Sequence, residues 1–198
     1  MYKRQLLYAG KDRLVISEDM NLRNFGSAFF ETTGVWLQVT LNLALQQGHI
    51  TFSKYGEALV SLSARRHSHL ALNADTLKQV YDDDNDGLVR FKTLIYFLGG
   101  PNADRRSHIT VTNEFLNQLE MSEGDTLKAR AATHALYSSM VLRGTPQDAK
   151  EWIALLMMGL DSIYRKSVID WVCGHFLDVQ GAIDLITALA NQKNESGS

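Results

Sequence analysis

The chain has 198 residues, of which 45% are hydrophobic and 21% charged, so it can form one globular domain or two small ones with a substantial core. Its formal net charge of −2 gives no overall attraction to nucleic acid or to an anionic membrane, and the absence of a long apolar run excludes a predicted membrane span. The single cysteine, Cys173, excludes an intramolecular disulfide and indicates a reducing, cytoplasmic location.

The hydrophobic pattern predicts a mostly α-helical fold with a small strand element near the N-terminus and a helical C-terminal layer. Only two prolines occur in the chain, which favours long helices. After a short helix or lead-in over residues 1–13, the first element expected is a buried strand at residues 14–16, and a second short strand is expected at residues 69–72. Helices are expected over residues 22–30, 35–47, 54–65, from Asn73 or Asp75 to 81, 91–98, 108–119, 126–143, from Pro146, 161–176 and 179–192.

A polar stretch at residues 121–125 is the clearest change of composition along the chain. It predicts a first lobe over residues 1–120 and a C-terminal helical layer over residues 121–198, and a single domain overall is the alternative. In the second part, the apolar run from Trp152 to Met158 is interpreted as core, with an interface to a partner chain or to a second copy as the alternative.

Two carboxylates, Glu18 and Asp19, directly follow the expected strand at residues 14–16. A buried strand would hold them rigidly, in a place suited to a divalent cation such as Mg²⁺ or Mn²⁺. Adjacent side chains on a strand point to opposite sides, so Asp19 is expected to be the closer ligand and Glu18 a supporting one. Asp75 would be a third ligand if the two short strands paired in parallel, because their carboxyl ends would then share one edge. The alternatives are a charged turn for the first two and a helix N-terminal acid for Asp75.

A resemblance to a known family runs through this part of the chain. The strand ends in Ser17, Glu18 and Asp19, Arg23 follows four residues beyond the aspartate, and Gly34 and Val35 precede the next helix. Together with the connection at residues 45–55 and the segment at residues 67–77, these features resemble the late part of a bacterial PIN-like nuclease domain, over about residues 14–119.

The resemblance implies metal-dependent cleavage of RNA or DNA, with Asp19 and Glu18 as catalytic metal-holding residues and Arg23 near the scissile phosphate. A PIN domain opens with a strand ending in Asp, followed by a Glu some tens of residues later. Here the residues before the strand contain only one carboxylate, Asp12. We therefore expect the chain to be incomplete as a nuclease and another polypeptide to supply the missing acidic residues. The alternative is a non-catalytic helical protein-interaction module.

The acidic loop at residues 82–87 is the second candidate metal site. Asp82, Asp84 and Asp86, followed by Gly87, stand in the order of the first, third, fifth and sixth positions of an EF-hand calcium loop. Thr93 stands at the twelfth position, where a bidentate Glu is expected. The sequence therefore predicts weak calcium binding at best, and the alternative is a solvated turn between two helices.

Two basic clusters could contact phosphate. Arg65 and Arg66 lie beside His67 and His69, and a second cluster occupies residues 105–108. The alternative for each is a solvated helix end, where a cation is favoured at a C-terminus by the helix dipole.

Overall fold

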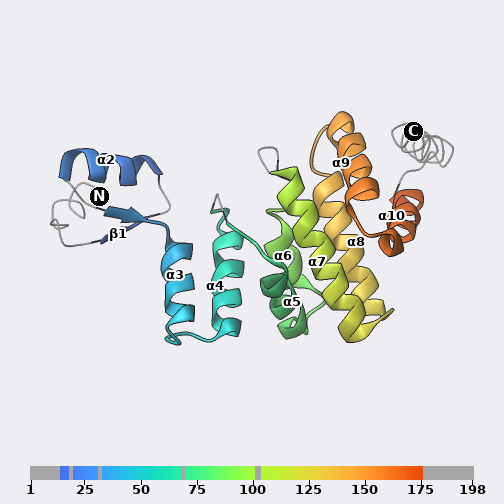
Figure 1. Cartoon of the computed structure of the whole chain (residues 1–198), viewed down its shortest axis with the longest axis horizontal. Helices are drawn as coiled ribbons and strands as arrows, with labels where there is room; N and C mark the ends of the chain where they lie inside the picture. The colour runs from blue at the N-terminus through green and yellow to red at the C-terminus, as the bar shows by residue number, and fades with distance from the viewer. Residues whose placement is uncertain (1–13, 18–19, 31–32, 68–69, 101–103, 176–198) are drawn as a thin grey trace. The chain divides into compact units, whose positions relative to one another are not determined.

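The computed structural model describes residues 14–17, 20–30, 33–67, 70–100 and 104–175 (Figure 1). The chain is mostly helical with a short strand element near the N-terminus, as predicted, and it divides into two compact units, Met1–Ala71 and Leu72–Ser198. The boundary predicted at residue 120 lies within helix α7 (Arg105–Glu123). The elements predicted over residues 1–13 and 179–192 lie outside the described residues.

Unit 1 begins with a parallel strand pair, β1 (Leu14–Ile16) and β2 (Thr33–Val35), joined by helix α2 (Met20–Phe30). Leu14 is opposite Thr33 and Ile16 is opposite Val35, and the Ser17 N–H extends the ladder by donating to the Val35 carbonyl at 3.1 Å. Parallel strands need a crossover connection, and α2 provides it. The two carboxyl ends therefore lie at the same edge.

The prediction of a strand at residues 69–72 was wrong over the residues described there, and the strand that pairs with β1 is β2. Residues 70–72 are not a strand, and residues 68–69 lie outside the described part. The buried side-chain amide of Gln38 takes the place of a strand partner: its Nε2 donates to the Ala71 carbonyl at 2.6 Å, and its Oε1 accepts from the Ala71 N–H at 2.8 Å. One side chain thus satisfies the backbone groups that a strand would have paired.

Helices α3 (Leu37–Gln46) and α4 (Phe52–Ala64) complete the described part of unit 1 and pack on each other (Figure 1). Gly48, at φ 73°, makes the turn between them. The N-cap of α4 is Thr51, whose hydroxyl accepts from the Lys54 N–H at 3.3 Å, so this helix begins two residues before the predicted start.

Unit 2 is a helical array of α5 (Ala74–Asp83), α6 (Val89–Ile95), α7, α8 (Leu127–Val141), α9 (Pro146–Gly159) and α10 (Ser162–His175). Side-chain oxygens cap four of these helices at Asn73, Asp104, Thr126 and Thr145. Pro146 occupies the first turn of α9, where its missing N–H costs nothing.

Aromatic side chains form the core of unit 2. Tyr81, Phe91 and Phe115 are fully buried, with ring centroids 5.3 to 6.0 Å apart, and they bind α5, α6 and α7 together. Tyr137 and Trp171, with ring centroids 6.1 Å apart, hold α8 and α10 together. Such buried rings dominate the stability of a small core. The apolar run of α9 contributes Trp152, Ile153 and Leu156 to this core, as predicted, while Met158 is exposed.

Candidate functional site

The carboxyl end of β1 is organised by Arg23, which α2 carries in its first turn. Its guanidinium Nη1 donates to the Ser17 carbonyl at 2.5 Å, and the guanidinium carbon Cζ lies 5.0 Å from the centroid of the Trp36 ring. Arg23 is 9% exposed, so this charge is held by a carbonyl and an aromatic face in a mostly dry place. The side chain connects the end of β1 to the residue after β2.

Gly34 in β2 leaves room for the side chain of Arg23 to pack against this strand. A Cβ at position 34 would stand 2.6 Å from both Cβ and Cγ of Arg23, which is far inside van der Waals contact. The glycine in the predicted Gly34–Val35 motif therefore makes room for the arginine stem. The role of Arg23 as a contact to a scissile phosphate stays a prediction. The structure shows in addition that the Arg23 side chain links the two strands.

The predicted metal ligands Glu18 and Asp19 lie outside the described residues, directly after Ser17. Asp75 is exposed in the first turn of α5 and accepts from Gln118 Nε2 at 2.6 Å. The strand that was to bring Asp75 to the edge of β1 is not formed over residues 70–72. The helix N-terminal position matches the alternative interpretation of Asp75.

The acidic loop joins α5 to α6, and its three aspartates have different surroundings. Asp82 is exposed and pairs with Lys78 one helical turn earlier, with Nζ and Oδ1 2.5 Å apart. Asp86 is exposed as well. Asp84 is 1% exposed, and both of its carboxylate oxygens accept backbone N–H groups: Asp86 N at 3.1 Å and Phe91 N at 2.9 Å.

Asp84 takes the place of a missing helix cap. The N-cap of α6 is Leu88, which is in the left-handed region at φ 64° and has no side-chain oxygen to offer. The Asp84 carboxylate reaches across the loop to the N–H of Phe91, the third residue of α6. An anion at a helix N-terminus is favoured both by the free N–H groups and by the helix dipole. The third position of the calcium-like pattern therefore has a structural task.

Thr93, at the twelfth position of that pattern, is also engaged. Its hydroxyl donates to the Val89 carbonyl at 2.8 Å within α6. Gly87 is in the left-handed region at φ 60°, which matches the sixth position of the pattern. The loop thus has the turn geometry of the motif, while two of its expected ligand positions are used in hydrogen bonds inside the protein.

The predicted phosphate contacts Arg65 and Arg66 follow α4 and are exposed. Arg65 is the C-cap of the helix, and Arg66 is in the left-handed region at φ 56° with its N–H donating to the Ser63 carbonyl at 2.8 Å. Their position at a helix C-terminus agrees with the dipole-balancing alternative. Their role as phosphate contacts stays a prediction.

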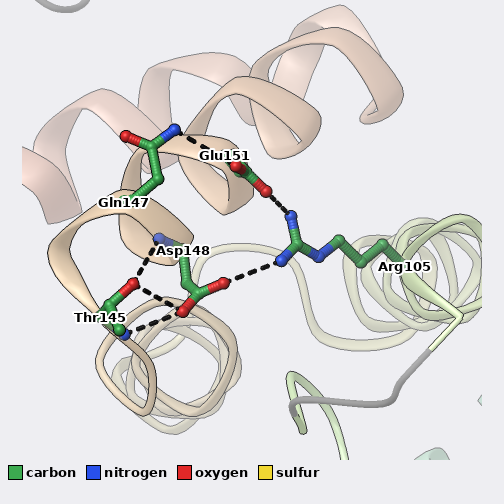
Figure 2. A network of polar contacts seen from close by, with 5 residues as sticks. All are labelled: Arg105, Thr145, Gln147, Asp148 and Glu151. Carbon is green, nitrogen blue, oxygen red and sulfur yellow. Dashed lines mark hydrogen bonds and ion pairs between the residues drawn. The ribbon is translucent and has the colours of Figure 1, made fainter.

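The second basic cluster contains a polar network that ties α7 to α9. Arg105 donates to the carboxylates of Asp148, at 3.0 Å, and Glu151 (Figure 2). Asp148 also accepts from the Thr145 N–H at 2.9 Å and from its hydroxyl at 2.7 Å, and the Asp148 N–H donates to the Thr145 hydroxyl oxygen at 3.2 Å, which completes a capping box. Gln147 donates to Glu151 at 3.2 Å. The Thr145 hydrogen bonds, followed by Arg105, hold the pKa of Asp148 below its usual range. Arg105 is thereby committed to a structural ion pair.

An open groove of about 290 Å³ in unit 2 is a feature that sequence reasoning missed. It lies between the C-terminal half of α7, the start of α8 and the start of α10. Its lining comprises Leu116, Leu119, Glu120, Gly124, Asp125, Ala129, Arg130, Thr133, His134, Ile163, Tyr164 and Ser167. No motif could have indicated it, because these residues come from three separate helices and from the connection between α7 and α8.

Among the residues that the structure describes, no three His, Cys, Asp or Glu side chains gather as a metal site would require. Within the same residues, no helix is long and apolar enough to cross a membrane. Comparisons with protein-family models, curated proteins and solved structures found no match. The PIN-like resemblance therefore rests on the sequence motifs.

Proposed function

We propose that unit 1 is part of a PIN-like, metal-dependent nuclease that acts on RNA or DNA and is incomplete without another polypeptide. The observation that carries this proposal is the parallel pairing of β1 and β2, with α2 as the crossover between them. In sheets of this type, ligands bind outside the carboxyl ends of the strands. Glu18 and Asp19 follow β1 at that end in the sequence, which is why we assign the metal ligands to them.

The need for a second polypeptide follows from coordination chemistry. Metal-dependent phosphodiester hydrolysis needs about three or four oxygen ligands that converge on one or two Mg²⁺ or Mn²⁺ ions, with water at the remaining positions. Glu18 and Asp19 supply only two, and Asp75 is hydrogen-bonded to Gln118 in unit 2. The remaining carboxylates are proposed to come from a partner that completes the sheet edge beside β1 or β2.

The test uses the full chain and the variant Asp19→Asn, which keeps the shape of the side chain and removes its charge. Mn²⁺ binding should be measured by calorimetry, and cleavage of single-stranded RNA and DNA should be assayed with the chain alone and with candidate partners. We expect Asp19→Asn to lower Mn²⁺ affinity and to lower cleavage by orders of magnitude. Asp75→Asn is the matched control, with the same chemical change at an exposed acid, and should leave both unchanged. Cleavage insensitive to Asp19→Asn would refute the assignment.

A non-catalytic protein-interaction module is the second candidate, and exposed apolar side chains in unit 1 favour it. Phe25 and Phe29 are one turn apart on α2 and are 42% and 69% exposed, with ring centroids 4.6 Å apart. Leu14 and Ile16, which share a face of β1, are 64% and 51% exposed, so the prediction that this strand is buried was wrong for that face. Exposed apolar groups that cluster mark surfaces that bind other proteins.

The two candidates differ in which of two substitutions, Phe29→Ser or Asp19→Asn, removes the function of the chain. If unit 1 acts only through contacts with other proteins, Phe29→Ser should abolish capture of a partner while Asp19→Asn has no effect on it. If the chain is part of a nuclease, Asp19→Asn should abolish cleavage while the partner remains bound. Sedimentation over a range of concentrations shows whether the partner is a second copy.

A further inference from the structure

The groove in unit 2 has an apolar floor. Leu116, Leu119 and Ala129 line it and are at most 4% exposed, and the ring of Tyr164 closes its α10 side at 8% exposed. Its volume of about 290 Å³ is at the lower end for ligand pockets, which hold about 300–1,000 Å³. A space of this size accommodates one long side chain better than a cofactor.

Of the charged side chains that the structure describes at the rim of the groove, some form ion pairs and one does not. Arg130 is taken up by the carboxylate of Asp125, which it contacts through two nitrogens. Glu120 is exposed and forms no hydrogen bond or ion pair through its carboxylate within the part of the chain that the structure describes. The Tyr164 hydroxyl donates to Asn117 Oδ1 at 2.8 Å, and Asn117 Nδ2 donates to Asp161 at 3.2 Å. Burial, followed by the negative charges of Glu120 and Asp161, raises the pKa of Tyr164.

Exposed apolar side chains accompany these acids. Ile163 lines the groove and is 64% exposed. Met121 directly follows the lining residue Glu120, and Leu127 lies two residues from the lining residues Asp125 and Ala129; they are 89% and 85% exposed. The carboxylate has no cationic partner among the described residues, and the three apolar side chains are exposed to solvent. A ligand that is basic and partly apolar would complement both features.

We propose that this groove binds an arginine or lysine side chain carried by an amphipathic helix of a partner protein. The aliphatic stem of that side chain packs on Leu119 and Ile163, and its cationic head pairs with Glu120 and reaches the Tyr164 oxygen. Apolar residues one turn away on the same helix cover Met121 and Leu127. This inference concerns a surface of unit 2 that is separate from the apolar surface of unit 1, and it does not depend on the nuclease proposal.

The probe is a phage-displayed library of amphipathic helices about 14 residues long, near the mean helix length, selected against the full chain. We expect the selected peptides to carry Arg or Lys at one central position. Replacing that arginine by citrulline, which keeps the shape without the charge, should weaken binding about fivefold, as should Glu120→Gln. Ile163→Ser should weaken binding to a similar extent. Glu114→Gln, another exposed acid of α7 that does not line the groove, is the matched control and should change nothing.

Several results would overturn the proposal. These are failure to select any peptide, selected peptides without a basic residue, or binding that is equal in Glu120→Gln, Ile163→Ser and the native chain. Self-association that Glu120→Lys abolishes would identify the occupant as a second copy and would also overturn it. Circular dichroism of each variant is the control that tests whether the variant is folded. Asp19→Asn should bind the peptide normally, so that failure of the nuclease proposal is separate from failure of this one.

Discussion

Replacing Asp84 by alanine tests whether the acidic loop is a structural cap or a metal site. The change removes the acceptor of the Phe91 N–H and of the Asp86 N–H. The Phe91 side chain is fully buried and the hydrogen bond is buried with it, so no water replaces the lost acceptor there. A hydrogen bond to a charged group contributes about 1.5–3 kcal/mol, and a buried donor left without a partner costs about 1–3 kcal/mol. We expect the free energy of unfolding to fall by about 2–4 kcal/mol.

The comparison with Asp82 makes this prediction specific. Asp82 is exposed and pairs with Lys78 at i,i+4, an interaction that contributes about 0.3–0.5 kcal/mol. Asp82→Ala should therefore change the free energy of unfolding by less than about 0.5 kcal/mol. Asp84→Asn retains one acceptor oxygen for the Phe91 N–H and should lose about half as much stability as Asp84→Ala.

The assay is urea unfolding at equilibrium, followed by circular dichroism and extrapolated linearly to water. Equal losses for Asp82→Ala and Asp84→Ala would refute the capping argument. Calorimetry should show no calcium binding at micromolar free ion, because Asp84 and Thr93 are used inside the protein. A rise in stability with micromolar calcium that disappears in Asp82→Ala would show that the loop reorganises around the ion.

Three further predictions follow from close contacts and from a half-buried histidine. Gly34→Ala should destabilise unit 1 by about 1–3 kcal/mol, because the new Cβ displaces the stem of Arg23; unchanged urea unfolding would contradict this. Gly99→Ala should destabilise the protein more than Gly34→Ala does, because the backbone at position 99 has φ 81° and a Cβ there would stand 2.4 Å from the Met140 Cα. A soluble variant with native thermal stability would refute this prediction. Burial lowers the pKa of His108 below its ordinary value, and its Nδ1 accepts the Gly99 N–H at 3.2 Å. Since the unfolded chain then binds the proton more readily, the free energy of unfolding should be highest above about pH 6.5 and should fall as the pH drops below that value. His108→Asn should make the free energy of unfolding less dependent on pH, as measured by urea unfolding between about pH 5 and 7.5.

Local patterns in the sequence were sufficient for most of the secondary structure. The apolar run at residues 14–16 forms β1 because three aliphatic residues, two of them β-branched, favour an extended backbone. The start of α9 at Pro146 and the turn at Gly87 follow from fixed or permissive backbone angles. These features depend on residues that are close in the sequence, and the same holds for the predominance of helix.

Only the tertiary structure decided which strands pair, which side chain caps which helix, and which helices line the groove. Nothing in the composition of Thr33–Val35 identifies it as the partner of β1, because a three-residue strand containing glycine has no periodicity to read. The sequence placed Asp84 in an acidic loop, but only the position of α6 makes that carboxylate its cap. The groove combines α7, α8 and α10, whose lining residues extend from Leu116 to Ser167. Propensity and patterning act over one or two helical turns, whereas the position of each element is set by which apolar faces pack together, and that depends on the whole unit at once.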